Sequence, residues 1–197
     1  AVACDPAFNF VYEANIRYLH HLGEVTYFSP LADTSLPDAD FVYLPGGYPE
    51  LYLAALSANR QMLQSIRRYV ESGGKLLAEC GGMMYLCDEI RDKNGDVYPM
   101  AGVLHQSATM ENMKLRLGYR TLLYNETRLK GHEFHYSRLV EQQNPLPSCA
   151  VAYTAKGVET DTPLYHYKNV WAGYTHLYWA DPVGNEWFTK FVIDGNT

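Results

Sequence analysis

Residues 75–90 read KLLAECGGMMYLCDEI. Residues 75–79 form a short apolar run that predicts a strand, and four later residues recur at the i, i+3, i+4, i+7 spacing of a helix face: Met83, Leu86, Cys87 and Ile90. Cys80 lies at the junction, with Ala78 and Gly82 two residues to either side. A tight strand-to-helix turn that carries a nucleophile is crowded and needs such small neighbours. The stretch therefore predicts a nucleophilic cysteine.

The expected position of Cys80 also indicates how it could react. At a helix N-terminus the helix dipole lowers the pKa of a thiol, and free N–H groups can bind an oxyanion. The alternative is a buried structural cysteine beside a glycine turn. The rest of the chain has to discriminate between the two.

Composition bounds the class of protein. A chain of 197 residues, 47% hydrophobic and 19% charged, suits one globular domain, residues 1–197. A formal charge of −6 argues against nucleic acid or an anionic membrane as partner, and no apolar run reaches the length of a membrane span or signal peptide. The four cysteines form no C-x-x-C pair, which favours reduced thiols and a cytoplasmic location. Because the chain begins at Ala1, without Met, we expect a fragment.

The first half alternates expected strands with expected helices. Strands are expected at 1–4, 24–28, 41–44 and 75–79, with helices ending near Gly23, over about 49–72 and after Cys80. Residues 29–40 form a loop rich in Pro, Asp and Ser. This rhythm predicts an α/β fold: an open, mainly parallel sheet with helices on both faces.

The second half predicts an antiparallel extension. Asn94-Gly95 is a turn signal, and residues 113–140 and 148–158 contain expected strands with short connections. Residues 172–179 form a late strand. Asp181-Pro182 then predicts the N-cap and first turn of a final helix.

Cysteine catalysis needs a base, which is usually a histidine. Of the seven histidines, His176 lies at the end of the late strand. Strand C-termini of a parallel sheet meet at one edge, the edge of Cys80, so His176 is the best candidate base. The alternative is an ordinary sheet histidine. We expect His20 and His21 on a helix surface, and His105 and His166 have no supporting context.

Residues 131–137, GHEFHYS, form the densest polar cluster. His132 and His135 have the spacing H-x-x-H without the helical i, i+4 spacing of a zinc-protease site, so we expect no metal here. A wall facing the substrate or a hydrogen-bonded structural cluster remains open.

A glycine turn follows the strand at 41–44. In Pro45-Gly46-Gly47-Tyr48-Pro49-Glu50, glycine lets a backbone N–H approach a ligand closely. The chain contains no G-x-x-x-x-G-K-[ST] sequence, so this is not an ATP P-loop. We expect an oxyanion hole formed by the N–H of Gly46 or Gly47 with that of Gly81. The alternative is a plain strand-ending turn.

Taken together, these segments resemble the glutamine amidotransferase domain of cobyrinic acid a,c-diamide synthases. The resemblance covers nearly the whole chain. It rests, in order, on DPAFNF (5–10), FSPL (28–31), LPGGYPEL (44–51), AECGGMMYL (78–86), GHEFHYS (131–137) and YTHL (174–177).

The resemblance implies a class I, flavodoxin-like glutaminase that frees ammonia from glutamine. It implies a C-terminal position behind an ATP-binding synthetase domain of the same polypeptide, which resembles dethiobiotin synthetase. That domain would use ATP and Mg²⁺ to amidate corrin carboxylates a and c in cobalamin biosynthesis, with a corrinoid as acceptor. The chain itself would need no cofactor.

The resemblance also assigns residues. Cys80 is implied as the nucleophile that forms a γ-glutamyl thioester, and His176 as the base. Residues implied in oxyanion or substrate binding are Gly46, Gly47, Tyr48, Gly81, Glu133 and His135. Class I amidotransferases carry Glu two residues after the histidine, where this chain has Tyr178. We therefore expect a backbone carbonyl or Glu133 to orient His176, or a Cys–His dyad with weaker activation.

Three other functions remain possible. The acceptor could be another tetrapyrrole, hydrogenobyrinate or nickel-sirohydrochlorin. The elbow could belong to a stand-alone cysteine hydrolase, or to a non-catalytic binding module that has kept the fold.

Overall fold

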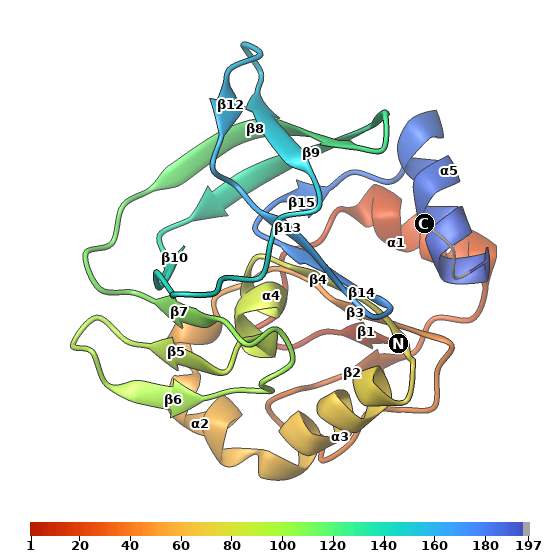
Figure 1. The fold of residues 1–197 in the computed structure, drawn as a ribbon. Coiled ribbons are helices and arrows are strands. Elements are labelled where there is room, and N and C mark those ends of the chain that lie inside the picture. The colour runs from red at the N-terminus through yellow and green to blue at the C-terminus, as the bar shows by residue number, and fades with distance from the viewer. Residues whose placement is uncertain (195–197) are drawn as a thin grey trace.

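The computed structural model describes residues 1–194, and its main sheet runs through the centre of the molecule (Figure 1). Five strands are parallel, and β13 is antiparallel to its neighbour β14. The strands in spatial order are β13 (Leu164–Tyr167), β14 (Val170–Gly173), β4 (Lys75–Glu79), β3 (Phe41–Leu44), β1 (Val2–Ala3) and β2 (Tyr27–Phe28).

Strands β3 and β4 have the bounds that the sequence predicts. Their runs FVYL and KLLAE are almost continuously apolar because both faces of a parallel sheet are covered. The two strands are paired with Leu44 opposite Ala78. Their carboxyl ends therefore lie side by side, and the Pro45-Gly46-Gly47 turn leaves the sheet next to Cys80.

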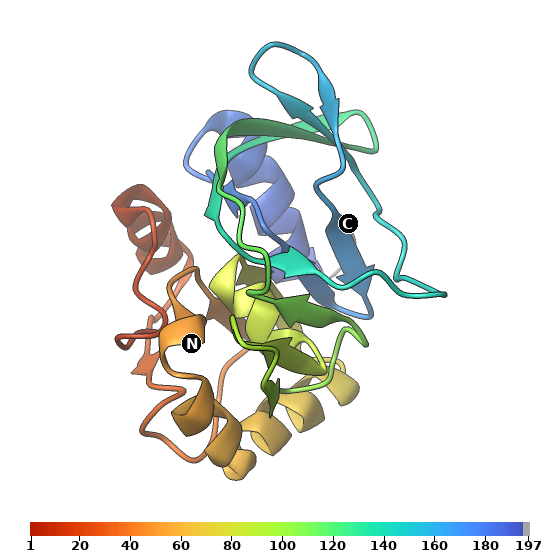
Figure 2. The same cartoon turned by 90° about the vertical axis from the view of Figure 1, so that its left-hand side faces the viewer.

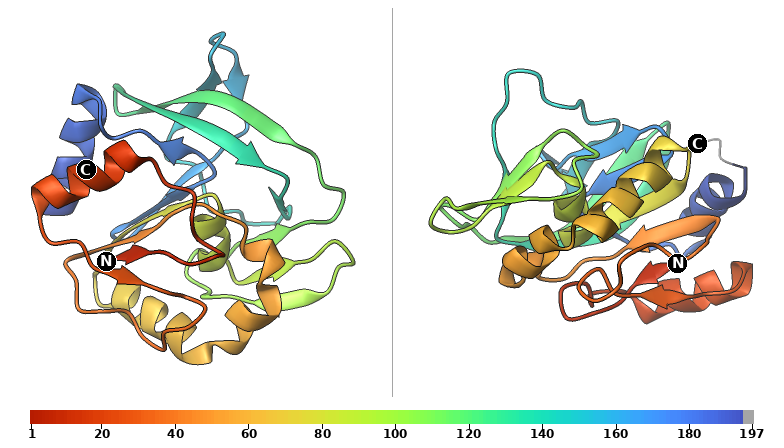
Figure 3. Two further views of the ribbon diagram at one scale, coloured as in Figure 1. Left: turned by 180° about the vertical axis from the view of Figure 1, so that it is seen from behind. Right: turned by 90° about the horizontal axis from the view of Figure 1, so that it is seen from below.

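Helices cover both faces of this sheet, which confirms the predicted α/β class (Figure 3). Helices α1 (Glu13–Leu22) and α5 (Pro182–Thr189) pack against Tyr43 and Leu77 on one face. The other face is covered by the 3₁₀ turn η1 (Pro49–Leu51), α2 (Leu53–Ala58), α3 (Arg60–Glu71) and α4 (Gly81–Leu86). Helix α5 begins as predicted, since Asp181 accepts a hydrogen bond from the Gly184 N–H at 2.7 Å. The chain then ends its described part in a π-helical turn, η2 (Lys190–Asp194).

Two smaller sheets complete the fold. A four-stranded sheet contains β10 (Arg138–Leu139), β7 (Ser107–Thr109), β5 (Glu89–Arg91) and β6 (Val97–Pro99). A five-stranded antiparallel sheet contains β12 (Glu159–Thr160), β11 (Val151–Thr154), β8 (Arg116–Tyr124), β9 (Thr127–His135) and β15 (His176–Leu177). It rises above the main sheet in Figure 2. The predicted antiparallel extension is confirmed.

Several expected elements are wrong in extent. The strand expected over 24–28 is only the two-residue β2, Tyr27–Phe28. The helix expected over 49–72 is divided into η1, α2 and α3, because Asn59 ends one helix and caps the next. Helix α4 ends at Leu86, and Ile90 belongs to β5. The strand expected over 172–179 is two strands in two different sheets, since β14 pairs with β4 and β15 with β9.

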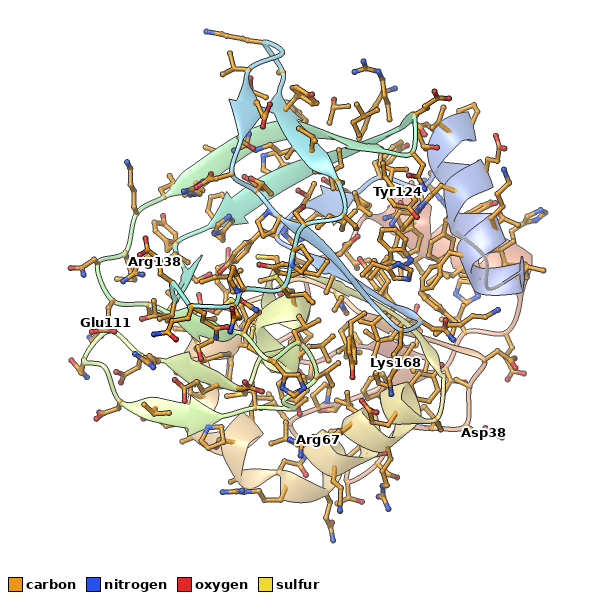
Figure 4. All side chains as sticks on the ribbon, in the orientation of Figure 1. Asp38, Arg67, Glu111, Tyr124, Arg138 and Lys168 are labelled. Carbon is orange, nitrogen blue, oxygen red and sulfur yellow. The ribbon has the colours of Figure 1, made fainter. Side chains whose placement is uncertain are left out.

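Side chains fill the space between these layers, while charged groups such as Asp38 and Glu111 lie at the edge of the view in Figure 4. Lys168, in the β13–β14 turn, pairs with Glu71 of α3. Tyr124 of β8 instead points inward and packs edge-on against Trp171 of the main sheet, with ring centroids 4.8 Å apart. The five-stranded sheet therefore shares its core with the main sheet.

Candidate active site

Cys80 occupies a strained turn between β4 and α4, as predicted. Its backbone has φ 49° and ψ −106°, a left-handed conformation that is uncommon outside glycine. The Cys80 N–H donates to Gly173 O at 2.8 Å, which fixes the turn to β14. A Cβ on Gly82 would lie 2.1 Å from Leu44 O, so only glycine fits beside β3. The small residue at this position is thus explained by close packing.

The two glycine turns predicted as an oxyanion hole are in contact. A Cβ on Gly47 would lie 2.1 Å from Ala7 O, and φ of Gly47 is +154°. A Cβ on Gly81 would lie 3.2 Å from Gly47 N. Within residues 1–194 the Gly47 N–H donates no hydrogen bond, and the Gly81 N–H is directed at the Cys80 sulfur. Both N–H groups are therefore available to a developing negative charge.

His176 meets this glycine turn from another sheet. The residue belongs to β15, which pairs antiparallel with β9, His176 opposite His132. A Cβ on Gly46 would lie 2.1 Å from His176 Cε1, so the imidazole packs on the Gly46 backbone. The Phe10 ring covers it with centroids 4.3 Å apart. His176 thus lies against the glycine turn that follows β3, but the predicted reason was wrong, because its strand is not part of the parallel sheet.

No side chain replaces the missing glutamate through a hydrogen bond to the imidazole. His176 Nδ1 is buried and has no hydrogen-bond partner within residues 1–194. Glu133 instead lies with its Oε2 2.7 Å from the Arg120 guanidinium. The expectation that a backbone carbonyl or Glu133 bonds this nitrogen is therefore wrong.

Burial disfavours the charged forms of both Cys80 and His176. It raises the pKa of the Cys80 thiol to about 12, with a further contribution from the Glu50 carboxylate. It lowers the pKa of His176 to about 3, with added repulsion from His132 and His135. The expected lowering of the thiol pKa by the helix dipole is wrong, because desolvation outweighs it.

Strand β9 and the segment after it form the opposite wall. The carbonyl oxygen of Phe134 lies 3.8 Å from Cys80 Sγ. His135 stacks on the Tyr174 ring with centroids 3.8 Å apart, and its Nδ1 is 2.9 Å from Ser137 O. Burial lowers the pKa of His135. The GHEFHYS segment therefore faces the thiol with a fixed, uncharged ring.

A narrow cavity opens at the thiol. It is lined by Gly47, Tyr48, Glu50, Cys80, Met84, Phe134, His135, Tyr136 and Ser137. The structure thus brings together four of the predicted residues here, while Gly46, Gly81, Glu133 and His176 lie behind or beside the lining. A cavity of about 620 Å³ lies at the amino-terminal end of the sheet, beside Ala1 and Asp40, and contains none of the predicted residues.

Two polar residues that were not predicted from the sequence hold the chain on the carboxyl side of His176. Glu79 is fully buried; its Oε2 accepts from the Tyr43 hydroxyl at 2.6 Å and its Oε1 from the Leu177 N–H at 3.0 Å. Asn15 of α1 donates to Leu177 O at 2.8 Å and accepts from the Trp179 N–H at 3.0 Å. The sequence could have pointed to Glu79, because it is a charged residue at the end of an otherwise apolar strand. Asn15 gave no signal.

The other candidate groups lie elsewhere. His20 and His21 are exposed on α1, as predicted. His105 lies beside Asp88, and His166 stacks on Trp171 with centroids 4.3 Å apart. In the described part of the chain no three His, Cys, Asp or Glu side chains gather as a metal site. None of its helices is long and apolar enough to cross a membrane.

The comparison with known proteins identifies the family to which the chain is similar. Residues 1–183 match the model of the CobB/CobQ-like glutamine amidotransferase domain. A hydrogenobyrinate a,c-diamide synthase of Pseudomonas aeruginosa is 40% identical over 183 residues, which cover 90% of this chain and 40% of that protein. A cobyrinate a,c-diamide synthase of Fusobacterium nucleatum is 40% identical over 187 residues, covering 90% and 41%. The chain thus spans about 40% of the length of these relatives.

Solved structures agree on the fold. A glutamine amidotransferase crystal structure matches 98% of this chain and 99% of its own, with a TM-score of 0.61 and 16% identity. A glutamine amidotransferase of Thermotoga maritima matches with a TM-score of 0.56 and 12% identity, over 98% of this chain and 81% of its own. At these identities the likeness concerns the fold alone.

Proposed function

Because the chain belongs to the CobB/CobQ-like glutamine amidotransferase domains, we propose that it hydrolyses glutamine to glutamate and ammonia, with Cys80 as nucleophile and His176 as base. The observation that carries this proposal is the convergence of three segments at one sheet edge. The strained Cys80 turn, the Gly46-Gly47 turn and His176 meet there within contact distance of one another's backbones or rings.

The mechanism follows from this arrangement. The Cys80 sulfur attacks the side-chain amide carbon of glutamine while His176 takes the thiol proton. The Gly47 and Gly81 N–H groups stabilise the oxyanion of the tetrahedral intermediate. His176 returns the proton to the leaving nitrogen, and ammonia departs. Water, deprotonated by His176, then hydrolyses the γ-glutamyl thioester to glutamate and restores the thiol.

The walls of the cavity supply the substrate contacts of the proposal. Tyr48 and His135 line the cavity, and the carboxylates of Glu50 and Glu133 both act electrostatically on Cys80. Carboxylates suit the α-ammonium group of glutamine. Glu133 Oε1 is buried without a hydrogen-bond partner in residues 1–194, which makes it a candidate acceptor.

The whole protein is proposed to be a cobyrinate a,c-diamide synthase. Relatives named cobyrinate a,c-diamide synthase are longer than this chain by more than half of their own length. We assign their remaining part to an N-terminal synthetase domain that uses ATP and Mg²⁺, takes up the ammonia and amidates carboxylates a and c of a corrinoid. This chain would need no cofactor, and we place the protein in the cytoplasm.

Replacement of the nucleophile tests the glutaminase. Cys80→Ser should lower glutamate release from glutamine to below about a thousandth of the unsubstituted rate. Amidation driven by added ammonia should persist in the full-length protein. Cys4→Ser, at an exposed cysteine, is the matched control and should keep full activity. Unchanged glutamine hydrolysis by Cys80→Ser would exclude the assignment, as would wild-type turnover of other amides in preference to glutamine.

A second pair of variants tests the placement of His176. Gly46→Ala puts a methyl group where the imidazole lies, whereas Gly23→Ala has nothing within 4 Å of the added carbon. A displacement of about 1 Å at a reacting group costs on the order of 100-fold in rate. Gly46→Ala should therefore lose glutaminase activity at that scale, and Gly23→Ala should lose none.

Hydrogenobyrinate is a second candidate acceptor. The relatives named for hydrogenobyrinate and for cobyrinate are both 40% identical to this chain, so identity favours neither. Amidation assays of the full-length protein with each corrinoid, one with and one without cobalt, decide between them. Conversion of the cobalt-free substrate alone would replace cobyrinate in the proposal.

A further inference from the structure

The nucleophile and the base of the proposed glutaminase stand on different sheets. Cys80 follows β4 of the main sheet, and His176 lies on β15 of the five-stranded sheet. Their relative position therefore depends on the two-residue link from β14 to β15 and on contacts between the sheets. The imidazole itself makes no such polar contact through Nδ1 within residues 1–194.

Glu79 makes the contact that is needed. The residue immediately precedes Cys80, and its Oε1 accepts the N–H of Leu177, which immediately follows His176, at 3.0 Å. The Glu79 carboxylate thus links the chain next to the nucleophile, Cys80, to Leu177, the residue next to the base. Its other oxygen accepts the Tyr43 hydroxyl of β3 at 2.6 Å, which orients the carboxylate from the main sheet.

The rest of the environment makes this contact rigid. Leu177 is held on its other side, since its carbonyl accepts from the Asn15 side chain at 2.8 Å. Glu79, Asn15 and Leu177 are all buried. Loss of this hydrogen bond would leave the buried N–H of Leu177 unsatisfied, which is costly.

We propose that Glu79 is a positioning residue for His176, acting through the backbone of Leu177 rather than on the imidazole. This inference rests on the proposed function. It gives the role of the missing glutamate, whose position is occupied by Tyr178, to the residue that precedes the nucleophile. Its hydrogen bonds go to Leu177 and Tyr43 and not to the imidazole, so its effect on His176 runs through the location of β15.

Two substitutions of Glu79 separate the effect of its side-chain length from the effect of its negative charge. Glu79→Gln keeps the length of the side chain, so its amide oxygen accepts from Leu177 and its NH₂ donates to the Tyr43 oxygen. Glu79→Asp keeps the charge but is one methylene too short to hold both partners. Tyr43→Phe is the matched control, because it removes one hydrogen bond to the same carboxylate and leaves the one that reaches Leu177 of β15.

The measurement is steady-state glutamine hydrolysis per folded molecule, with kcat and KM separated. Glu79→Asp should lower kcat by ~30–100-fold with KM within about threefold, as expected for a displaced base. Glu79→Gln and Tyr43→Phe should keep kcat within about fivefold of the unsubstituted protein. The rate at which a diazo-ketone glutamine analogue alkylates Cys80 should follow the same order.

Other results overturn the inference. A merely structural Glu79 would give three variants with altered stability and unchanged kcat. A role for the negative charge would give the reverse order, with Glu79→Gln impaired and Glu79→Asp active. Failure of the proposed function is distinguishable, since the unsubstituted protein would then release no glutamate and its Cys80 would resist the analogue.

Discussion

Glu79 and His176 are both buried, and burial shifts their pKa values in opposite directions. The pKa of Glu79 is raised to about 7 from an ordinary value of 4.5, and that of His176 is lowered to about 3 from 6.5. Groups facing Glu79 are the Tyr43 and Tyr12 hydroxyls, the Trp179 indole and the Cys80 thiol; those facing His176 are His132 and His135. Each shift links folding to pH.

The contributions of Glu79 and His176 to folding stability change with pH in opposite directions. Folded Glu79 binds a proton that the unfolded chain has released, so its contribution to stability falls as pH rises from about 4.5 to 7. Folded His176 stays uncharged where the unfolded chain is protonated, so its contribution falls as pH drops from 6.5 towards 3. Between about pH 4.5 and 6.5 the two slopes cancel in large part.

Removing one of the two groups should reveal the pH dependence of stability that the other contributes. We expect the free energy of unfolding of Glu79→Gln to rise with pH between 4.5 and 6.5, and that of His176→Gln to fall between 4.5 and 7, each by on the order of 3 kcal/mol. Urea unfolding at half-unit pH steps measures both. Glu141→Gln, at an exposed carboxylate, should reproduce the unsubstituted curve. Parallel curves for all four proteins would contradict the prediction.

At the scale of elements, the helical region 49–72 shows what one residue decides. Asn59 separates α2 from α3: its Oδ1 accepts from the Met62 N–H at 3.3 Å, and its Nδ2 donates to Pro30 O and Asp33 O at 2.8 Å each. The side chain thus caps a helix and also ties it to the 29–40 loop.

Removal of this cap has a predictable cost. Asn59→Ala should lower the free energy of unfolding by about 1–3 kcal/mol, because it removes an N-cap and two hydrogen bonds to the loop. Gln61→Ala, at an exposed position in α3, should change it by less than about 0.5 kcal/mol. Urea unfolding of the three proteins at one pH measures both. Equal stability of Asn59→Ala and Gln61→Ala would contradict the role of Asn59.

Elements that depend on local pattern could be predicted from the sequence. Strands β3 and β4 and the cap at Asp181 follow from apolar runs, glycine turns and capping chemistry within a few residues. The strand-to-helix turn at Cys80 likewise follows from residues close to it in the sequence. The division of 49–72 could not be predicted, because Asn59 breaks the helix with partners 26 and 29 residues away.

The support of the base could not be predicted for the same reason. The Leu177 N–H bonds Glu79 across 98 residues, and Leu177 O bonds Asn15 across 162. Only the fold brings these groups together. The thiol pKa was wrongly expected to fall because burial, which opposes the helix dipole, depends on the second wall formed by β9.

At the scale of the whole molecule, the site requires the two sheets to remain docked. Their shared core contains all three tryptophans of the chain: Trp171 on β14, Trp179 after β15 and Trp187 on α5. Trp171 packs against Trp187 with ring centroids 5.3 Å apart, and Trp179 stacks on Phe188 at 4.0 Å. Tryptophan fluorescence therefore reports on the junction, whereas circular dichroism reports on all sheets and helices.

We expect the junction and the rest of the fold to unfold together. In thermal or urea unfolding, fluorescence, circular dichroism and the reactivity of Cys80 with a thiol reagent should share one midpoint, because a common core makes the sheets interdependent. Trp171→Phe should move the three midpoints down together by an amount equivalent to roughly 2 kcal/mol, since it leaves a cavity in that core. A fluorescence transition that precedes the circular dichroism transition, with Cys80 already exposed, would instead mean that the five-stranded sheet undocks as a separate unit.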